Sequence, residues 1–230
     1  MTTIKEINLK GIIGLSLIIS LLFVFLYPVL EPITANAIDS QFTVKQTVTS
    51  EIAFATSPSN VTMSPSIPGL TGGTATGQAT FSVITNNATG YNVTLVSSST
   101  DGAMMGETQG GKINAYTPSS VGVPDYTFSV GANTGEFGYT VLQATEADAG
   151  PLFKSDGASA CNTGSTNDGT HCWLNATSSA VTIVNRSSET AIAGELTTLN
   201  FKVQITSNPS PIIPTDTYTA TTTITAVTNP

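Results

Sequence analysis

The segment TYTATTTITAV, residues 217–227, decides the fold class of this chain. Tyr218, Ala220, Ile224 and Ala226 fall on one parity, and threonine fills the odd positions from 217 to 225. Successive side chains of a β-strand point to opposite faces, and threonine is β-branched and suits a solvated strand face. The segment therefore predicts a strand with one apolar face and one hydroxyl-rich face.

The same period of two runs through most of the chain. From Phe42 to Phe54 the even positions are mostly apolar and the odd positions mostly polar, which predicts one long half-buried strand. Pairs of glycine, asparagine and aspartate separate the strand candidates, as expected for tight turns. The further candidates are residues 80–85, 91–97, 126–130, 137–142, 181–184 and 199–205. Such a series predicts an all-β fold, a single β-sandwich of the Ig-like or jelly-roll type.

The N-terminal residues carry the features of an export signal. Lys5 and Lys10 precede an uncharged run at residues 11–30, and Ala35-Asn36-Ala37 offers the small-x-small pattern of a signal peptidase site. We expect a signal peptide over residues 1–37, with a signal helix cleaved after Ala37, and a secreted domain over residues 38–230. Retention of the run as a membrane anchor stays open, because about 20 apolar residues can span a bilayer.

Charge and composition narrow the class of partner. The formal net charge is −8, and only 10% of the residues are charged. An acidic surface repels phosphate backbones, so nucleic acid is not an expected partner. The 39 threonines and 24 serines supply the polar surface instead. This composition is typical of secreted β proteins, which predicts a secreted protein that is extracellular or attached to the cell surface.

Two cysteines, Cys161 and Cys172, flank a loop rich in glycine and asparagine. In an exported chain this spacing predicts a disulfide that closes the loop, with the adjacent Trp173 covering the bond. The competing interpretation is a metal site with His171 as a third ligand. A structural metal site ordinarily needs four ligands, so the disulfide is preferred and no metal is expected.

The sequence offers few catalytic side chains. His171 is the one histidine and would have to serve as the base of any Ser-His-Asp arrangement, but a solvated loop residue is the simpler interpretation. Glu146 and Asp148 form the closest carboxylate pair and lie in a polar segment expected to be a solvated turn. We therefore predict no enzyme, no catalytic residues and no cofactor.

Other site types have weak signals. Asp156, Asn167 and Asp168 could offer oxygen ligands to calcium, but no calcium-loop motif is present. Lys45 and Lys202 lie on the polar parity of their strands, so we expect solvated ammonium groups rather than covalent cross-links.

Aromatic rings could form a sugar-binding face. Trp173 and Tyr116 fall in loop-like segments, whereas Tyr126 and Tyr139 fall on strand candidates. Core packing is the expected role of the two strand tyrosines.

Two stretches resemble WxL-type cell-surface domains. Residues 81–95, FSVITNNATGYNVTL, are similar to the first motif of that family, and residues 218–230, YTATTTITAVTNP, to its terminal strand. Tyr91 and Ile224 stand where the family has its two tryptophans. The resemblance implies a β-rich secreted domain held noncovalently on a Gram-positive cell wall.

These observations together predict a non-enzymatic structural or adhesive protein of the bacterial cell surface. Its expected partners are the cell envelope, other surface proteins or further copies of itself. One alternative is a pilin-like filament subunit that assembles by strand exchange through the segment starting at Phe42. The other alternative is a carbohydrate-binding module.

Overall fold

The computed structural model describes residues 9–26, 39–99 and 101–230. It separates into two units, residues 1–47 and 48–230. In the first unit, α1 (Leu9–Leu26) coincides with most of the predicted apolar run. The predicted cleavage residues Ala35 and Ala37 lie outside the described residues. No helix of the described ranges is long and apolar enough to cross a membrane.

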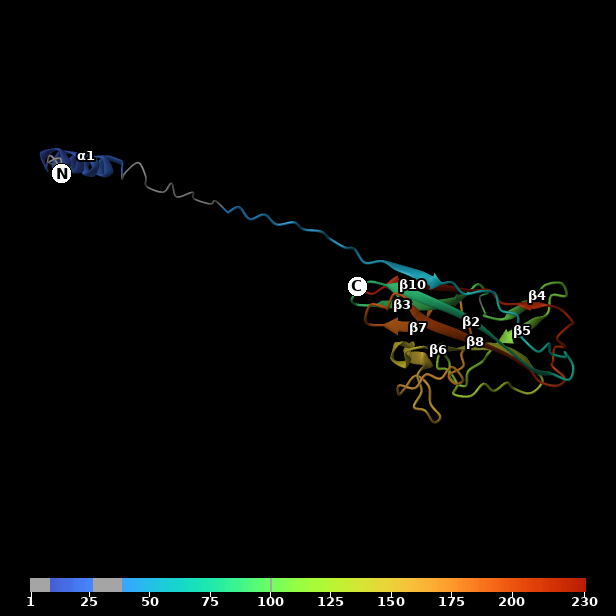
Figure 1. Ribbon diagram of the computed structural model, residues 1–230. Coiled ribbons are helices and arrows are strands. Elements are labelled where there is room, and N and C mark those ends of the chain that lie inside the picture. Colours follow the sequence, from blue (N-terminus) through green and yellow to red (C-terminus); the bar gives the residue numbers. More distant parts are fainter. Residues whose placement is uncertain (1–8, 27–38, 100) are drawn as a thin grey trace, which may run out of the picture. The chain divides into compact units, whose positions relative to one another are not determined.

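The second unit is built from strands, which confirms the strand-rich fold class (Figure 1). Its two sheets have the orders β1-β2-β8-β6-β5-β4-β9 and β10-β3-β7. Among the described strands, every pair is antiparallel except β5 with β6. The strands are β1 (Ile52–Thr56), β2 (Gly73–Thr85), β3 (Tyr91–Ser97), β4 (Met104–Gly106), β5 (Lys112–Ala115), β6 (Gly135–Gln143), β7 (Val181–Arg186), β8 (Glu195–Ile205), β9 (Tyr218–Thr219) and β10 (Thr222–Thr228).

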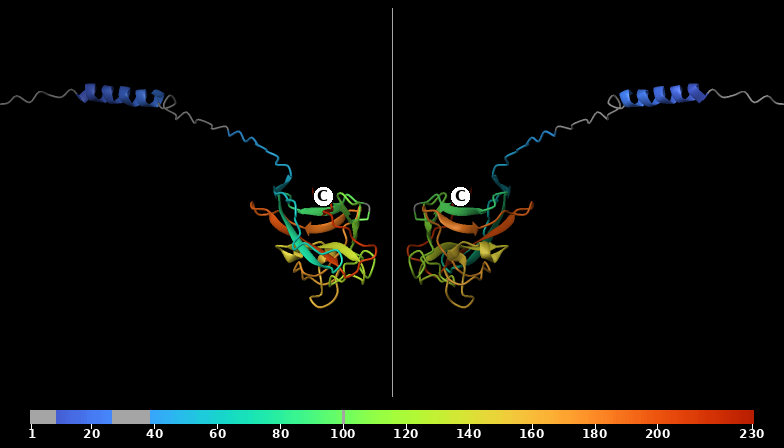
Figure 2. Two further views of the ribbon diagram at one scale, coloured as in Figure 1. Left: turned by 90° about the vertical axis from the view of Figure 1, so that its right-hand side faces the viewer. Right: turned by 90° about the vertical axis from the view of Figure 1, so that its left-hand side faces the viewer.

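The alternation predicted from sequence accounts for the core. Along β8, Leu199, Phe201, Val203 and Ile205 are buried, and the residues between them are only partly so. β3 alternates in the same way, with Tyr91, Val93 and Leu95 fully buried. Residues of both sheets join one core cluster. In Figure 2, β3 and β7 of the smaller sheet lie next to each other, and β6 of the larger sheet lies across from them.

Three features differ from the strand pattern expected from sequence. Residues 126–130 form no strand, and the polar segment of Glu146 and Asp148 forms the 3₁₀ helix η2 (Glu146–Asp148), which η3 (Pro151–Phe153) follows. The C-terminal segment is divided into β9 and β10. Most importantly, the long strand predicted from Phe42 is wrong, because residues 39–51 belong to no strand and pairing begins at Ile52.

Candidate functional site

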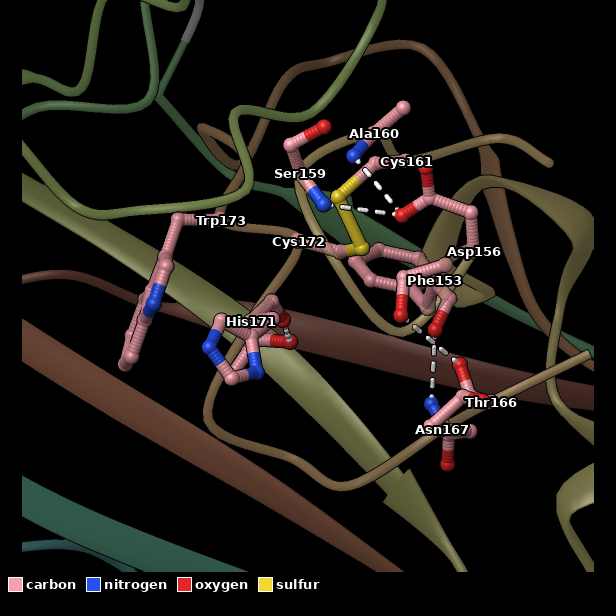
Figure 3. The surroundings of a disulfide bond; sticks show 12 residues. Phe153, Asp156, Ser159, Ala160, Cys161, Thr166, Asn167, His171, Cys172 and Trp173 are labelled. Carbon is pink, nitrogen blue, oxygen red and sulfur yellow. Dashed lines mark hydrogen bonds between the residues drawn. A yellow bond between two sulfur atoms is a disulfide. The ribbon is translucent and has the colours of Figure 1, made fainter. Parts of the chain in front are cut away.

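The predicted disulfide between Cys161 and Cys172 is present, with a Cα–Cα distance of 5.5 Å (Figure 3). Cys172 is buried in the main core, whereas Cys161 is only partly buried. The chain on the Cys172 side runs along β6, where Tyr139 and Leu174 exchange backbone hydrogen bonds of 2.8 and 2.9 Å. The bond therefore attaches an irregular loop to a strand of the larger sheet.

Asn167 holds the same loop from inside. Its side chain is buried and donates hydrogen bonds to the carbonyls of Val141 (2.9 Å) and Phe153 (2.8 Å). Its Oδ1 accepts a hydrogen bond of 2.7 Å from the N–H of Gln143. One amide thus satisfies three buried backbone groups from β6 and η3, which makes Asn167 a structural residue and not a metal ligand.

Asp156 organises the tip of the loop. Its Oδ1 accepts hydrogen bonds from the backbone N–H groups of Ala158, Ser159 and Ala160, at 2.9, 2.8 and 3.0 Å. Hydrogen bonds to a carboxylate stabilise its charged form, and they lower the pKa of Asp156 to about 2. One of the two carboxylate oxygens considered as calcium ligands is therefore already used by the backbone.

Asp168 and His171 form a pair beside the disulfide. His171 Nδ1 lies 2.6 Å from Asp168 Oδ2 and 3.1 Å from the Thr170 hydroxyl, and the imidazole stacks on Tyr126 with ring centroids 3.9 Å apart. Burial raises the pKa of Asp168, but hydrogen bonds from Thr170 and His171 outweigh it and leave that pKa lowered. The histidine lies in a loop and keeps 31% of its side chain exposed, and these contacts fix the orientation of its ring.

This pair lacks the third member of a catalytic arrangement. A nucleophilic hydroxyl would have to approach Nε2, because the carboxylate occupies Nδ1. In the described part of the chain, the polar contacts of the imidazole involve Nδ1 alone. The geometry therefore supports an imidazole that stacks on Tyr126, rather than one that acts as a base for a nucleophilic hydroxyl.

A second aromatic cluster lies apart from the main core and consists of Tyr116, Phe128 and Trp173. Phe128 stacks on Tyr116 at 4.5 Å and meets Trp173 edge to face at 5.2 Å. All three are buried, and the Trp173 indole donates a hydrogen bond of 2.9 Å to the carbonyl of Thr170. Trp173 packs with these rings and points away from the disulfide in Figure 3, so the prediction that it covers the bond is wrong.

Lys202 lies over this cluster. Its Nζ is 5.1 Å from the Phe128 ring centroid and 5.6 Å from that of Trp173, which is within cation–π range. The side chain leaves the main core, as its parity predicts, but it packs on aromatic rings and is not simply solvated. Tyr116 donates a hydrogen bond of 2.7 Å to Asp125, and burial, followed by this bond, raises the pKa of the phenol.

Arg186 forms an ionic cluster that the sequence did not indicate. Its Nη1 lies 2.5 Å from Asp148 Oδ2 and 3.6 Å from Glu195 Oε2, and all three side chains are at most 16% exposed. Asp148 is therefore a buried partner of arginine, and the expected solvated turn is wrong for this residue. Burial and, next, the charge of Glu195 raise the pKa of the neighbouring Tyr91 hydroxyl.

The geometry of this cluster indicates a structural role. Arg186 lies on β7 of the smaller sheet, Glu195 on β8 of the larger sheet, and Asp148 in η2, so the guanidinium connects three elements. Glu146, the other member of the predicted carboxylate pair, is exposed and lies outside this cluster. A sequence pattern could not find the cluster, because its members come from separate segments.

The residues considered as calcium ligands do not converge. Asp156 caps a turn, Asn167 points into the core, and Asp168 pairs with His171. Across residues 9–26, 39–99 and 101–230, no three histidine, cysteine or acidic side chains are grouped to hold a metal ion.

A shallow hollow of about 480 Å³ lies beside the end of β2. Ile84, Ala88 and Ile192 give it a mainly apolar wall, and Asn86, Glu189 and two threonines complete it. Asn86 also fixes the chain before β1, since it donates to the carbonyl of Thr49 (3.1 Å) and accepts from the N–H of Glu51 (2.7 Å). The hollow therefore adjoins the residues that lead directly into β1.

No protein-family model matches the chain, and no curated protein is significantly similar to it.

Proposed function

We propose that this protein is an exported, non-enzymatic β-sandwich with a structural or adhesive role at the bacterial cell surface. The observation that carries the proposal is the Cys161–Cys172 disulfide, which locks a loop onto the larger sheet. Disulfides of this kind persist in oxidising compartments outside the cytosol. The uncharged run before the A-x-A pattern at residues 35–37 supports export by the same route.

The buried polar groups support a structural role. The acidic and amide side chains around the loop serve backbone N–H and carbonyl groups, and the Arg186 cluster connects the two sheets. The alternative of a carbohydrate-binding module fits less well. Trp173 and Tyr116 are 7% and 1% exposed, whereas sugar-binding sites present flat rings to the solvent.

Cell fractionation tests the proposal. We expect the protein in the envelope or the medium, with its first residue at Ile38 by N-terminal sequencing and with both cysteines resistant to alkylation. A variant with Ala35 and Ala37 both replaced by leucine should remain unprocessed, because signal peptidase requires small residues at these two positions. Thr34→Leu is the matched control and should be processed normally, since it lies beside the small-x-small pattern and leaves it intact. Cytosolic protein with two free thiols would refute the proposal.

A further inference from the structure

Residues 42–48 carry a strand pattern, and none of the described strands pairs with them. Phe42, Val44 and Val48 are 86%, 83% and 81% exposed, although they share one parity of the segment. Thr43, Lys45 and Thr47 occupy the other parity. An exposed alternating segment of this kind is what an added β-strand presents to another sheet.

The segment has no turn that would return it to its own sheet. Residues 41–49 contain no glycine, proline, asparagine, aspartate or serine, the residues that ordinarily make tight turns. The chain is also held immediately before β1, where Asn86 binds the backbone of Thr49 and Glu51. The segment therefore lacks the turn residues that folding back along β1 would ordinarily need.

β10 offers a free edge. It ends the smaller sheet, and β3 is its one ladder partner among the described strands. The N–H of Ser98 bonds to the carbonyl of Thr221, and the N–H of Asn229 bonds to the carbonyl of Gly90. Both bonds continue the β3–β10 register, so the odd residues of β10 direct their backbone groups to β3.

The even residues of β10 consequently direct their backbone N–H and carbonyl groups to the open edge. These residues are Thr222, Ile224, Ala226 and Thr228, and their side chains are also the ones on the partly buried face. Ile224 and Ala226 pack against the core but are only partly covered, whereas their neighbours on β3, Leu95 and Val93, are fully buried. The core is thus incompletely covered along this edge.

The edge strand β1 of the other sheet lies in contact with β10, and the side chains of both strands are still only partly buried. β1 contacts β10 without sharing a ladder with it. Ile52 and Phe54 of β1 are likewise only partly buried although they pack on the same core. Apolar side chains therefore remain partly exposed along the seam between β1 and β10. The apolar face of one more strand would cover them.

We propose that residues 42–48 of one copy add as a strand to the open edge of β10 in a second copy. The segment's backbone would pair with the four even residues of β10, and Phe42, Val44 and Val48 would cover the partly exposed side chains of the seam. Charge favours the match, because Lys45 is the single charge of residues 40–47 while residues 48–230 carry four basic and twelve acidic side chains.

The donor segment and the receiving edge are different surfaces of the same molecule. Such a contact is heterologous, so each added copy leaves one free edge and one free segment, and the product is an open filament wherever the rotation between copies does not close a ring. This inference rests on the proposed surface role, since it gives that role a means of assembly.

Size measurement of the full chain in mild detergent tests the inference. We expect the wild-type protein to form a concentration-dependent ladder of oligomers by sedimentation velocity and filaments by electron microscopy. The variant V44D/V48D should be monomeric, because a carboxylate cannot enter an apolar seam. The matched variant T43D/T47D places the same charges on the other parity and should still assemble.

A change on the receiving side completes the test. Ala226→Pro removes an N–H from the open edge and leaves the N–H groups that bond to β3, so it should block assembly while the melting temperature of the monomer stays near that of the wild type. A wild-type chain that remains monomeric at every concentration would overturn the inference. So would assembly that survives V44D/V48D, or a closed dimer in place of a filament. None of these results depends on where the protein is located, so they are independent of the fractionation test.

Discussion

At the scale of single residues, carboxylates and amides replace secondary structure as the organisers of the irregular segments. Asp156 binds three N–H groups in the disulfide loop, and Asp216 binds the N–H groups of Thr108 and Gln109 in a different loop. Hydrogen bonds to these carboxylates lower the pKa of both to about 2. The stability of both loops should therefore depend on pH, because these hydrogen bonds need ionised carboxylates.

The first prediction concerns pH. The pKa of Asp156 is 3.8 when unfolded and about 2 when folded, so the unfolded chain binds more protons between these values. The stabilising contribution is complete above about pH 4 and is lost as the pH falls through about 2. In Asp156→Asn, thermal unfolding recorded from about pH 2 to 7 should show a smaller decline at acid pH than the wild type. Glu146→Gln, at an exposed position, is the control, and an unchanged decline in Asp156→Asn would contradict this account.

The second prediction concerns the disulfide. Closing a ring of about a dozen residues contributes roughly 3 kcal/mol by restricting the unfolded chain, so Cys161→Ser should lower the melting temperature by about 6 to 12 °C. Cys172 is one member of a core formed mainly by strand residues, so the variant should keep its β-type circular dichroism. Reductant should lower the melting temperature of the wild type by a similar amount and leave the variant unaffected. If reductant lowers the melting temperature of both proteins equally, loss of the disulfide is not the cause of the decrease in the wild type.

At the scale of elements, the attachment of β10 depends on its last residues. Asn229 donates hydrogen bonds of 2.8 Å to the carbonyls of Thr89 and Arg186 and accepts one of 2.5 Å from Asn92. Its own carbonyl accepts a hydrogen bond from Asn87. These contacts hold the end of an edge strand that has a ladder on one side.

The third prediction follows from this arrangement. Asn229→Ala leaves the Asn92 amide and two carbonyls without their partner, and we expect a loss of about 1–3 kcal/mol. The loss should be local, so hydrogen exchange of the β10 amides should accelerate more than that of β8. Thr225→Ala, at an exposed position on the same strand, should leave both rates nearly unchanged. If hydrogen exchange accelerated equally in β8 and β10, the effect of Asn229→Ala would not be local to β10.

At the scale of the whole molecule, the two sheets share a core and the Arg186 cluster. The guanidinium of β7 neutralises Asp148 from η2 and lies near Glu195 from β8, in surroundings that exclude most water. Removal of one partner from a buried ionic group leaves uncompensated charge, which costs more than an exposed pair would.

The fourth prediction is that Arg186→Met lowers the unfolding free energy by about 3 kcal/mol in urea titrations. The double variant Arg186→Met/Asp148→Asn removes one of the stranded charges and should recover part of the loss. Lys112 and Asp101 form an exposed pair at 3.3 Å, and Lys112→Met is the control, with an expected effect below about 1 kcal/mol. A loss as small as that of the control would show that solvent reaches the cluster.

The sequence by itself determined which side chains share a strand face and which cysteines pair. Leu199, Phe201 and Val203 are buried as their parity predicts, because a side-chain period of two is a local property of extended backbone. The disulfide could be predicted because the chain has two cysteines, they lie close in sequence, and the chain is expected to be exported, so each cysteine has few other partners.

Tertiary structure decided which of those strands have a neighbour and which polar groups meet. Phe42–Phe54 has the pattern of one strand, yet pairing starts at Ile52, because a ladder needs a second chain segment that local periodicity cannot report. Residues 126–130 likewise contribute Phe128 to an aromatic cluster without forming a strand. Arg186, Asp148 and Glu195 meet only after β7, η2 and β8 are assembled, since electrostatic partners are chosen by distance in space and not by spacing in sequence.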